Sequence, residues 1–214
     1  MPGGRQLFII MSDREYQSCV YRISEPTSDI EDETKIRSLG RPVLVLDKSI
    51  FPELMSFAQM DSRIFMVGGF LSNNSTPKPV PSRDVFIYDT AYSTLVRGPS
   101  LNSGKINPYR FTSGSKLFVL STLIYSSDRK TRSRKQKQKI QFEMLDTSDP
   151  VGGWCALPVP SLYVSDKDLK YEVYSVAAVS SMIFISLMDG GTYVFDIDTQ
   201  LWDYASDEPK FLLK

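Results

Sequence analysis

Apolar and polar residues alternate in short runs along this chain, and each run ends at small or polar residues. Three segments align without a gap: Ser56–Gly69, Tyr109–Thr122 and Ser175–Met188. Each contains a strand-like run, two turn-forming residues and a strongly apolar run. Short runs rich in Val, Ile and aromatic residues, bounded by Gly, Ser, Asn and Asp, are typical of strands. The segments predict β-hairpins, and no stretch has a helical period of useful length.

The three predicted hairpins share equivalent positions. Phe65, Phe118 and Phe184 fall at the same place in the apolar run, so we expect them to pack in a core. The predicted turns are Asp61-Ser62, Gly114-Ser115 and Ser180-Ser181. Such self-similarity predicts a repeat architecture.

A second pattern follows each hairpin: a strand that ends in Asp, and then a Leu or Trp. The pairs are Asp89 and Leu95, Asp146 and Trp154, and Asp196 and Trp202. Successive Asp residues are 57 and 50 positions apart. Because the three carboxylates occupy equivalent positions, we expect each to close a turn by accepting backbone N–H bonds, and we assign none of them to catalysis.

Together the patterns define repeated units over residues 56–101, 107–160 and 171–209. A fainter copy spans 5–47, where Leu7–Met11 resembles the apolar strand and Ser18–Ile23 the following one, without its Asp. We therefore predict one domain over 1–214.

The unit resembles a kelch repeat. Ile64–Gly69 gives an apolar strand that ends in the pair Gly68 and Gly69, and Asp84–Asp89 gives a strand that ends in Tyr-Asp. The kelch pattern then has a Trp about six residues later. Each copy is degenerate, since the first has Leu95 in place of Trp and the last has Leu187-Met188 in place of Gly-Gly. The chain is also similar to plant kelch-like proteins of unknown function.

The resemblance implies an all-β, kelch-type β-propeller of about four degenerate blades, either closed or an incomplete, open ring. Such blades stack around an axis, because one blade cannot bury both faces alone. Trp154 and Trp202 are then expected in the core, and Gly68 and Gly69 at tight backbone positions that require glycine.

Charge is balanced overall, with 25 basic and 25 acidic residues, but the segment 129–139 is strongly basic. Outside it the chain has 18 basic and 25 acidic residues, a net charge of −7. We expect residues 126–139 to form a solvated loop between two strands. Its cations are Arg129, Lys130, Arg132, Arg134, Lys135, Lys137 and Lys139.

The chain contains no histidine, which is the usual general base near neutral pH and the commonest metal ligand. Several classes of catalytic site and metal site are therefore excluded. A Ser-His-Asp site, or a zinc or copper site that contains His, cannot be built here. The two cysteines are 136 positions apart, which predicts neither a disulfide framework nor a metal site. We assign no catalytic, cofactor or metal residues. No signal peptide or membrane-spanning run is visible, so a cytoplasmic or nuclear protein is expected.

Three hypotheses for function follow. The first is a non-enzymatic module that binds an unidentified protein partner through rim loops, among them 71–82 and 126–139, as a substrate adaptor or otherwise. Related plant domains serve ubiquitin ligases beside an F-box, which we do not find before the first predicted strand. The second is an enzyme, or a carbohydrate- or small-molecule-binding propeller, without histidine. The third is a nuclear or nucleic-acid-associated protein that uses the basic segment 129–139.

Overall fold

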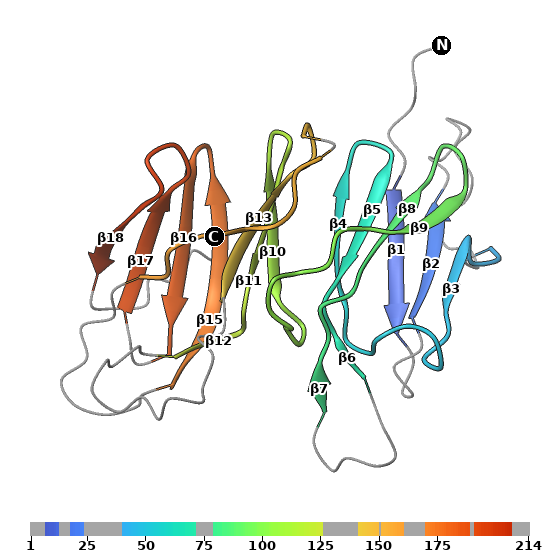
Figure 1. The fold of residues 1–214 in the computed structure, drawn as a ribbon, viewed down its shortest axis with the longest axis horizontal. Helices are drawn as coiled ribbons and strands as arrows, with labels where there is room; N and C mark the ends of the chain where they lie inside the picture. Colours follow the sequence, from blue (N-terminus) through green and yellow to red (C-terminus); the bar gives the residue numbers. More distant parts are fainter. Residues whose placement is uncertain are drawn as a thin grey trace, which may run out of the picture. The chain divides into compact units, whose positions relative to one another are not determined.

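The computed structural model describes residues 7–12, 18–23, 40–71, 79–125, 141–149, 151–160, 170–188 and 191–206. The chain divides into two compact units, Met1–Glu53 and Leu54–Lys214, which we describe separately as unit 1 and unit 2. The described residues form 18 strands and no helix, so the expected all-β class is confirmed (Figure 1).

Unit 1 contains one antiparallel sheet, blade 1. Its three strands are β1 (Leu7–Ser12), β2 (Ser18–Ile23) and β3 (Leu44–Leu46), in that spatial order. The buried residues of this sheet are Val20, 0% exposed, and Leu46, 4% exposed.

Unit 2 contains three further blades, each with four antiparallel strands in chain order. Blade 2 consists of β4 (Ser56–Met60), β5 (Arg63–Val67), β8 (Val85–Asp89) and β9 (Thr94–Arg97). Blade 3 consists of β10 (Tyr109–Ser113), β11 (Lys116–Leu120), β13 (Phe142–Asp146) and β14 (Cys155–Ala156). Blade 4 consists of β15 (Lys170–Val179), β16 (Met182–Leu187), β17 (Gly191–Asp196) and β18 (Leu201–Ser206).

Three short strands lie outside these sets of four strands. β6 (Phe70–Leu71) and β7 (Val80–Pro81) pair with each other between β5 and β8. β12 (Leu123–Tyr125) follows the second strand of blade 3 in the chain but pairs with β15, so it belongs to the sheet of blade 4. The chain of blade 3 thereby contributes an edge strand to the next blade.

The local sequence explains the hairpins. The first residues of the three predicted turns adopt left-handed backbone conformations, with φ of 50° at Asp61, 55° at Gly114 and 53° at Ser180. Gly, Asp and, less readily, Ser accept this conformation at a tight turn. The registers that follow place Phe65 opposite Ile87, Phe118 opposite Met144 and Phe184 opposite Val194.

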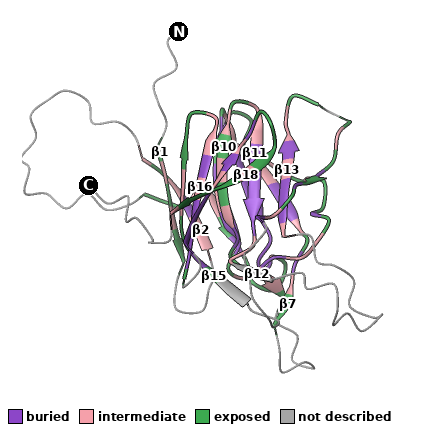
Figure 2. Ribbon diagram, turned by 90° about the vertical axis from the view of Figure 1, so that its left-hand side faces the viewer, coloured by how far each residue is buried: buried purple, intermediate pink, exposed green. Residues whose placement is uncertain are grey.

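Two apolar cores fill the spaces between the blades of unit 2. One joins Phe65 and Val67 of blade 2 to Leu117 and Val119 of blade 3. The other joins blade 3 to blade 4, and its members include Phe118, Phe142, Ile183, Ile185 and Phe195. Buried positions run along the middle of the strands, while the turns are exposed (Figure 2). The facing apolar surfaces of blades 2 and 3, and those of blades 3 and 4, thus cover each other, as stacked blades require.

In each of these two seams, a tryptophan makes the same hydrogen bond to the preceding blade. The Trp154 indole N–H of blade 3 donates to the carbonyl of Pro99 at the end of blade 2, at 2.8 Å. The Trp202 indole N–H of blade 4 donates to the carbonyl of Pro158 at the end of blade 3, also at 2.8 Å. Each bond satisfies the polar tip of a large apolar side chain while its rings pack in the seam.

Candidate functional site

The two ends of the sheets in unit 2 differ in construction. At one end, which we call the turn end, short turns join the first strand of a blade to the second and the third to the fourth. At the other, the connector end, the second strand passes to the third and the fourth passes to the next blade. Antiparallel order alone places these connections together. The connector end therefore carries residues 68–71, 79–84 and 98–108, together with Tyr125 and Gln141 on either side of the segment between them.

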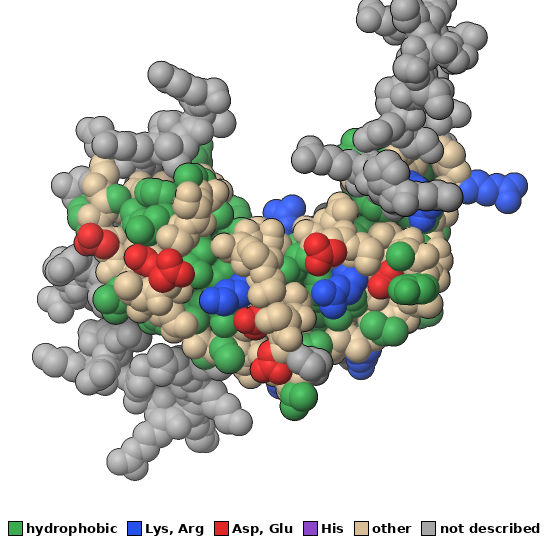
Figure 3. All heavy atoms as spheres, turned by 90° about the horizontal axis from the view of Figure 1, so that it is seen from above, with side chains coloured by type: hydrophobic (Ala, Val, Ile, Leu, Met, Phe, Trp, Pro, Cys, Tyr) green, Lys and Arg blue, Asp and Glu red, His purple; other side chains and the backbone are tan. Residues whose placement is uncertain are grey.

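The turn end holds the three repeated aspartates. Asp89 accepts N–H bonds from Ala91 and Tyr92, Asp196 from Asp198 and Thr199, and Asp146 from Ser148. Each carboxylate therefore closes its own turn. Hydrogen bonds from Ser148 and from the Ser115 hydroxyl hold the pKa of Asp146 below its ordinary value of 3.8. Acidic side chains are visible across this end in Figure 3.

The connector end presents apolar side chains on a projecting ribbon. Leu71 of β6 and Val80 of β7 are cross-strand partners and are 39% and 45% exposed. Met188, which follows β16, is 48% exposed at the same end of blade 4. Exposed apolar side chains beside polar connections are typical of surfaces that bind other proteins.

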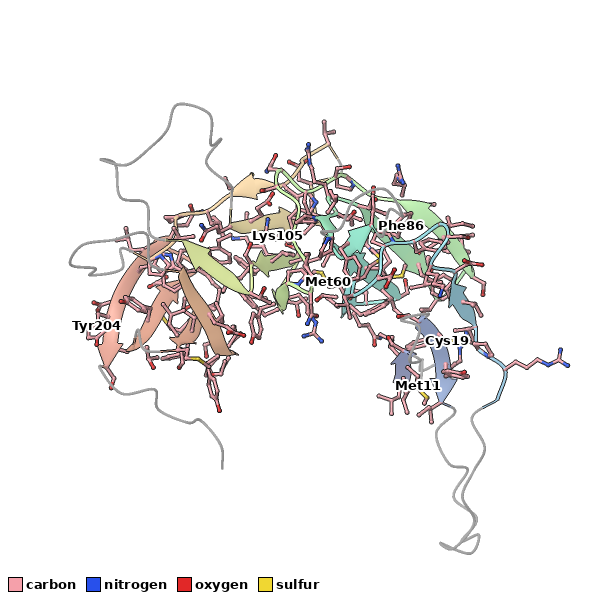
Figure 4. The ribbon with its side chains drawn as sticks, turned by 90° about the horizontal axis from the view of Figure 1, so that it is seen from below. Met11, Cys19, Met60, Phe86, Lys105 and Tyr204 are labelled. Atoms are coloured by element: carbon pink, nitrogen blue, oxygen red, sulfur yellow. The ribbon has the colours of Figure 1, made fainter. Side chains whose placement is uncertain are left out.

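Beneath this surface lies a buried ion pair that joins blades 2 and 3. Lys105, labelled in Figure 4, comes from the connector between the blades, and Glu143 comes from β13. Both side chains are 0% exposed. The Lys105 ammonium donates to the Glu143 carboxylate. Glu143 also accepts the backbone N–H groups of Asn102, at 2.7 Å, and Ser103, at 3.2 Å. One carboxylate therefore binds the connector at three points, which fixes the path of the chain between the blades.

This ion pair has a structural role. Burial lowers the pKa of the Lys105 ammonium, and the hydrogen bond and charge of Glu143 oppose that shift. With both groups paired and no side-chain surface exposed, neither can reach a substrate. Among the residues that the structure describes, no group of three or more His, Cys, Asp or Glu could hold a metal, and no helix could cross a membrane.

The Gly pair lies against the same connector. Gly68 and Gly69 have φ of 71° and 92°, in the left-handed region that favours glycine. The Gly69 N–H donates to the Lys105 carbonyl at 2.8 Å, and a Cβ on Gly68 would lie 2.6 Å from that oxygen. Glycine is required because the two backbones approach closely, and the contact holds blade 2 to the connector.

The structure does not bring the predicted candidates into one site. Asp89, Asp146 and Asp196 lie at the turn end, Trp154 and Trp202 lie in the two seams, and the Gly pair lies at the connector end. The basic residues from Arg129 to Lys139 lie outside the described residues, as does most of the loop 71–82.

Sequence reasoning did not find Lys105 and Glu143. The available signal was Glu143 itself, a lone carboxylate in the otherwise apolar run Phe142–Leu145. Its partner is 38 residues earlier, in a Ser- and Gly-containing connector that resembles an ordinary surface loop. Nothing in one sequence pairs the two residues.

The comparisons with known proteins agree with this fold. The solved structure titled "Structure of YjhT", a kelch-repeat β-propeller, matches with a TM-score of 0.59 and 11% identity. The match covers 98% of this chain and 67% of that chain. At this identity the likeness shows the fold alone, and it confirms the expected propeller architecture. A comparison with curated proteins finds no sequence match.

A family model assigns the chain more directly. The model described as "Protein of unknown function (DUF1668)" matches residues 4–209, which include every strand described above. The chain therefore belongs to the DUF1668 family, and within it has the fold of a kelch-like β-propeller.

Proposed function

We propose that this chain is a non-enzymatic interaction module that binds a protein partner through the connector end of unit 2. The observation that carries the proposal is the exposed apolar ribbon of β6 and β7 at the connector end, which lies beside the connector that the buried ion pair holds. The carboxylates at the turn end are engaged in closing their own turns. The connector end combines long connections with exposed apolar side chains. The buried ion pair of Lys105 and Glu143 holds the connector between blades 2 and 3 in place beneath them.

This construction suits recognition better than catalysis. Binding loops are commonly placed on a rigid scaffold, which reduces the ordering cost of association. The buried pair of Lys105 and Glu143 stabilises the scaffold without exposing a reactive group. A cytoplasmic or nuclear partner is part of the proposal, and its identity is left to experiment.

The test compares two surface variants in a quantitative affinity-capture experiment followed by direct titration of each recovered protein. The first variant carries Leu71→Asp and Val80→Asp, which place charges on the exposed ribbon of the connector end. The matched control is Tyr92→Asp, because Tyr92 is 80% exposed at the turn end. We expect the ribbon variant to weaken binding at least tenfold, about 1.4 kcal/mol, and the control to bind like the wild type.

The reverse result would contradict the proposal. If Tyr92→Asp abolishes binding while the ribbon variant retains it, the turn end is the binding surface. If every recovered protein binds both variants with unchanged affinity, the connector end has no role in recognition. Circular dichroism and thermal unfolding of each variant confirm that a change in binding does not reflect loss of fold.

A second candidate function is nuclear targeting or nucleic-acid association by the basic segment. It is favoured by seven Lys or Arg residues within the eleven positions 129–139. Such a segment suits an import receptor or a phosphate backbone. Replacing Arg132, Arg134 and Lys135 with Ala is expected to shift the protein from the nucleus to the cytoplasm. An unchanged distribution, with unchanged retention on immobilised nucleic acid, would exclude this function.

A further inference from the structure

Two segments at the connector end of unit 2 lie side by side at the start of blades 2 and 3. Residues 54–57 lead into β4, and residues 107–110 lead into β10. Each of these strands is an edge strand of its own sheet, and the two strands contact each other. The Asn107 N–H donates to the carbonyl of Leu54 at 3.1 Å, which joins the two segments at their first residues. We call residues 54–57 and 107–110 the entry pair.

The side chain of Arg110 joins the entry pair again at its last residues. The Arg110 Nε–H donates to the carbonyl of Phe57 at 2.8 Å, so the guanidinium of a blade 3 residue lies against the first strand of blade 2. Arg110 is exposed, and among the described residues no carboxylate forms an ion pair with it. Arg97, on the fourth strand of blade 2, is in contrast paired with Asp84. Arg110 is therefore held in place through Nε, and its two terminal amino groups remain available to a ligand.

A guanidinium held in this way is suited to binding a carboxylate. Its terminal amino groups present parallel N–H donors that match the two oxygens of a carboxylate, and such charge-assisted bonds are strong. Because Nε is already bonded, less side-chain freedom is lost when a ligand binds. The one cation of residues 98–108, Lys105, is 0% exposed and bonded to Glu143. A single available positive charge matches the single charge of a carboxylate better than the nearly double charge of a phosphate.

The first residues of the entry pair have an unusual backbone conformation. Leu54 and Asn107 both lie in the left-handed region, with φ of 52° and 42°. Asn accepts this conformation readily, whereas it is uncommon and strained for Leu. Leu54 is also 37% exposed and belongs to neither core, so core packing does not explain the strain. Strain of this kind clusters at ligand-binding sites. The entry pair thus has an exposed apolar side chain at one end and a guanidinium at the other.

The entry pair adjoins the exposed ribbon of β6 and β7. Gly69, immediately before β6, donates its N–H to the carbonyl of Lys105, two residues before the second segment of the entry pair. The ring of Pro108, within that segment, lies 3.3 Å from the place that a Cβ on Gly68 would take. The ribbon and Arg110 are therefore carried by neighbouring segments of the connector end, where one protein partner can contact both.

We propose that Arg110 binds the carboxylate of an Asp or Glu side chain on the protein partner, and that Leu54 contacts an apolar side chain of the same partner segment. The inference rests on the proposed function and deepens it, because it assigns a chemistry to the partner: an acidic segment with apolar neighbours. A protein segment is favoured over a small carboxylic acid because the guanidinium is exposed beside the apolar ribbon, where only a larger ligand makes both contacts. Arg is also among the residues that most often dominate the binding energy of protein interfaces.

The probe is a set of peptide pools that differ only at one fixed position. Each peptide is acetylated and amidated, has Glu, Gln or phosphoserine at its centre, and has random uncharged residues on both sides. Each pool is titrated against the 214-residue chain. We expect the Glu pool to bind about tenfold more tightly than the Gln pool, and Arg110→Gln to weaken binding of the Glu pool by a similar factor. Arg110→Lys keeps the charge but not the parallel donors, so its affinity should lie between those of Arg110→Gln and the wild type.

The matched control is Arg97→Gln, which removes the same charge from the fourth strand of blade 2 and should bind the Glu pool like the wild type. The basic segment 129–139 is present in every variant, so its attraction for acidic peptides does not produce a difference between them. Equal binding of the Glu and Gln pools would overturn the inference. So would unchanged binding by Arg110→Gln, or tighter binding of the phosphoserine pool than of the Glu pool.

A partner recovered by affinity capture separates this inference from the proposed function. If the variant with Leu71→Asp and Val80→Asp weakens its binding and Arg110→Gln does not, the connector end binds without Arg110 and the inference is wrong. If Arg110→Gln weakens binding of the partner and of the Glu pool while the ribbon variant binds like the wild type, the carboxylate site stands and the role proposed for the ribbon is wrong. Circular dichroism of both Arg110 variants confirms that they are folded.

Discussion

Removing the Glu143 carboxylate is expected to destabilise the fold severely, because it leaves the buried Lys105 ammonium without a counter-ion. In Glu143→Ala the Lys105 ammonium loses its counter-ion while its side chain stays 0% exposed. The N–H groups of Asn102 and Ser103 lose their acceptor at the same time. Breaking a buried pair by deleting one partner costs about 3–5 kcal/mol. The loss from the two N–H groups overlaps with this figure and is not simply added to it.

A double variant separates the effect of the unpaired buried charge from the effect of the lost side-chain volume. Lys105→Met combined with Glu143→Leu removes both charges and retains most of the side-chain volume. Replacing a buried ion pair by apolar residues is often close to neutral. The two N–H groups still lack an acceptor, at about 1–3 kcal/mol for an unsatisfied group. We therefore expect the double variant to be more stable than Glu143→Ala and less stable than the wild type.

The assay is equilibrium urea unfolding, with the midpoint and the slope compared among the wild type, Glu143→Ala and the double variant. Arg97→Gln serves as the control, since the Arg97 side chain is 65% exposed in its ion pair with Asp84. A surface pair contributes about 0–1 kcal/mol. If Glu143→Ala costs no more than this control, the pair is solvated and our account of the connector is wrong.

Three further predictions concern single positions. Trp154→Phe removes the indole N–H and leaves a proline carbonyl without its donor, so urea unfolding should show a loss of about 1–3 kcal/mol. Gly68→Ala should cost about 1–2 kcal/mol or more, because its φ is 71° and the new Cβ meets a backbone oxygen, whereas Gly153→Ala, with open space around it, should change stability by less than about 0.5 kcal/mol. The folded-state pKa of Asp146 is below 3.8, so its contribution is present above that pH and is lost as the pH falls through the folded value. Asp146→Asn should therefore show a weaker acid dependence of unfolding below pH 3.8.

The repeats could be predicted from the sequence because their causes are local. A turn needs a residue that tolerates the left-handed conformation, and an Asp at the end of a strand closes the next turn with its own carboxylate. Asp61 and Asp89 show these two rules at neighbouring turns of blade 2. The kelch-like architecture followed from such positions, and both the fold comparison and the described sheets confirm it.

The rest depends on contacts between distant segments. Glu143 was recognisable only as a carboxylate in an apolar strand, and its pairing with Lys105 required the path of the connector. The pairing of β12 with β15 required the position of the next blade. Phe184 was expected in a core by analogy with Phe65 and Phe118, but it is only half-buried and belongs to neither core. Burial at this position depends on a contact with another segment, which the hairpin's own sequence does not specify.

The tryptophan bonds have a consequence for where this fold can lengthen. Trp154 lies eight residues after Asp146, whereas Trp202 lies only six after Asp196, so the turn before the indole already varies. The interval from Leu95 or Trp154 to the following proline is four residues in both cases. In this repeat, the hairpin tip can take insertions without altering how blades stack. A single residue added between Trp154 and Pro158 would instead move the carbonyl oxygen to which Trp202 donates. The blades that follow the insertion would then lose their contact with the blades before it.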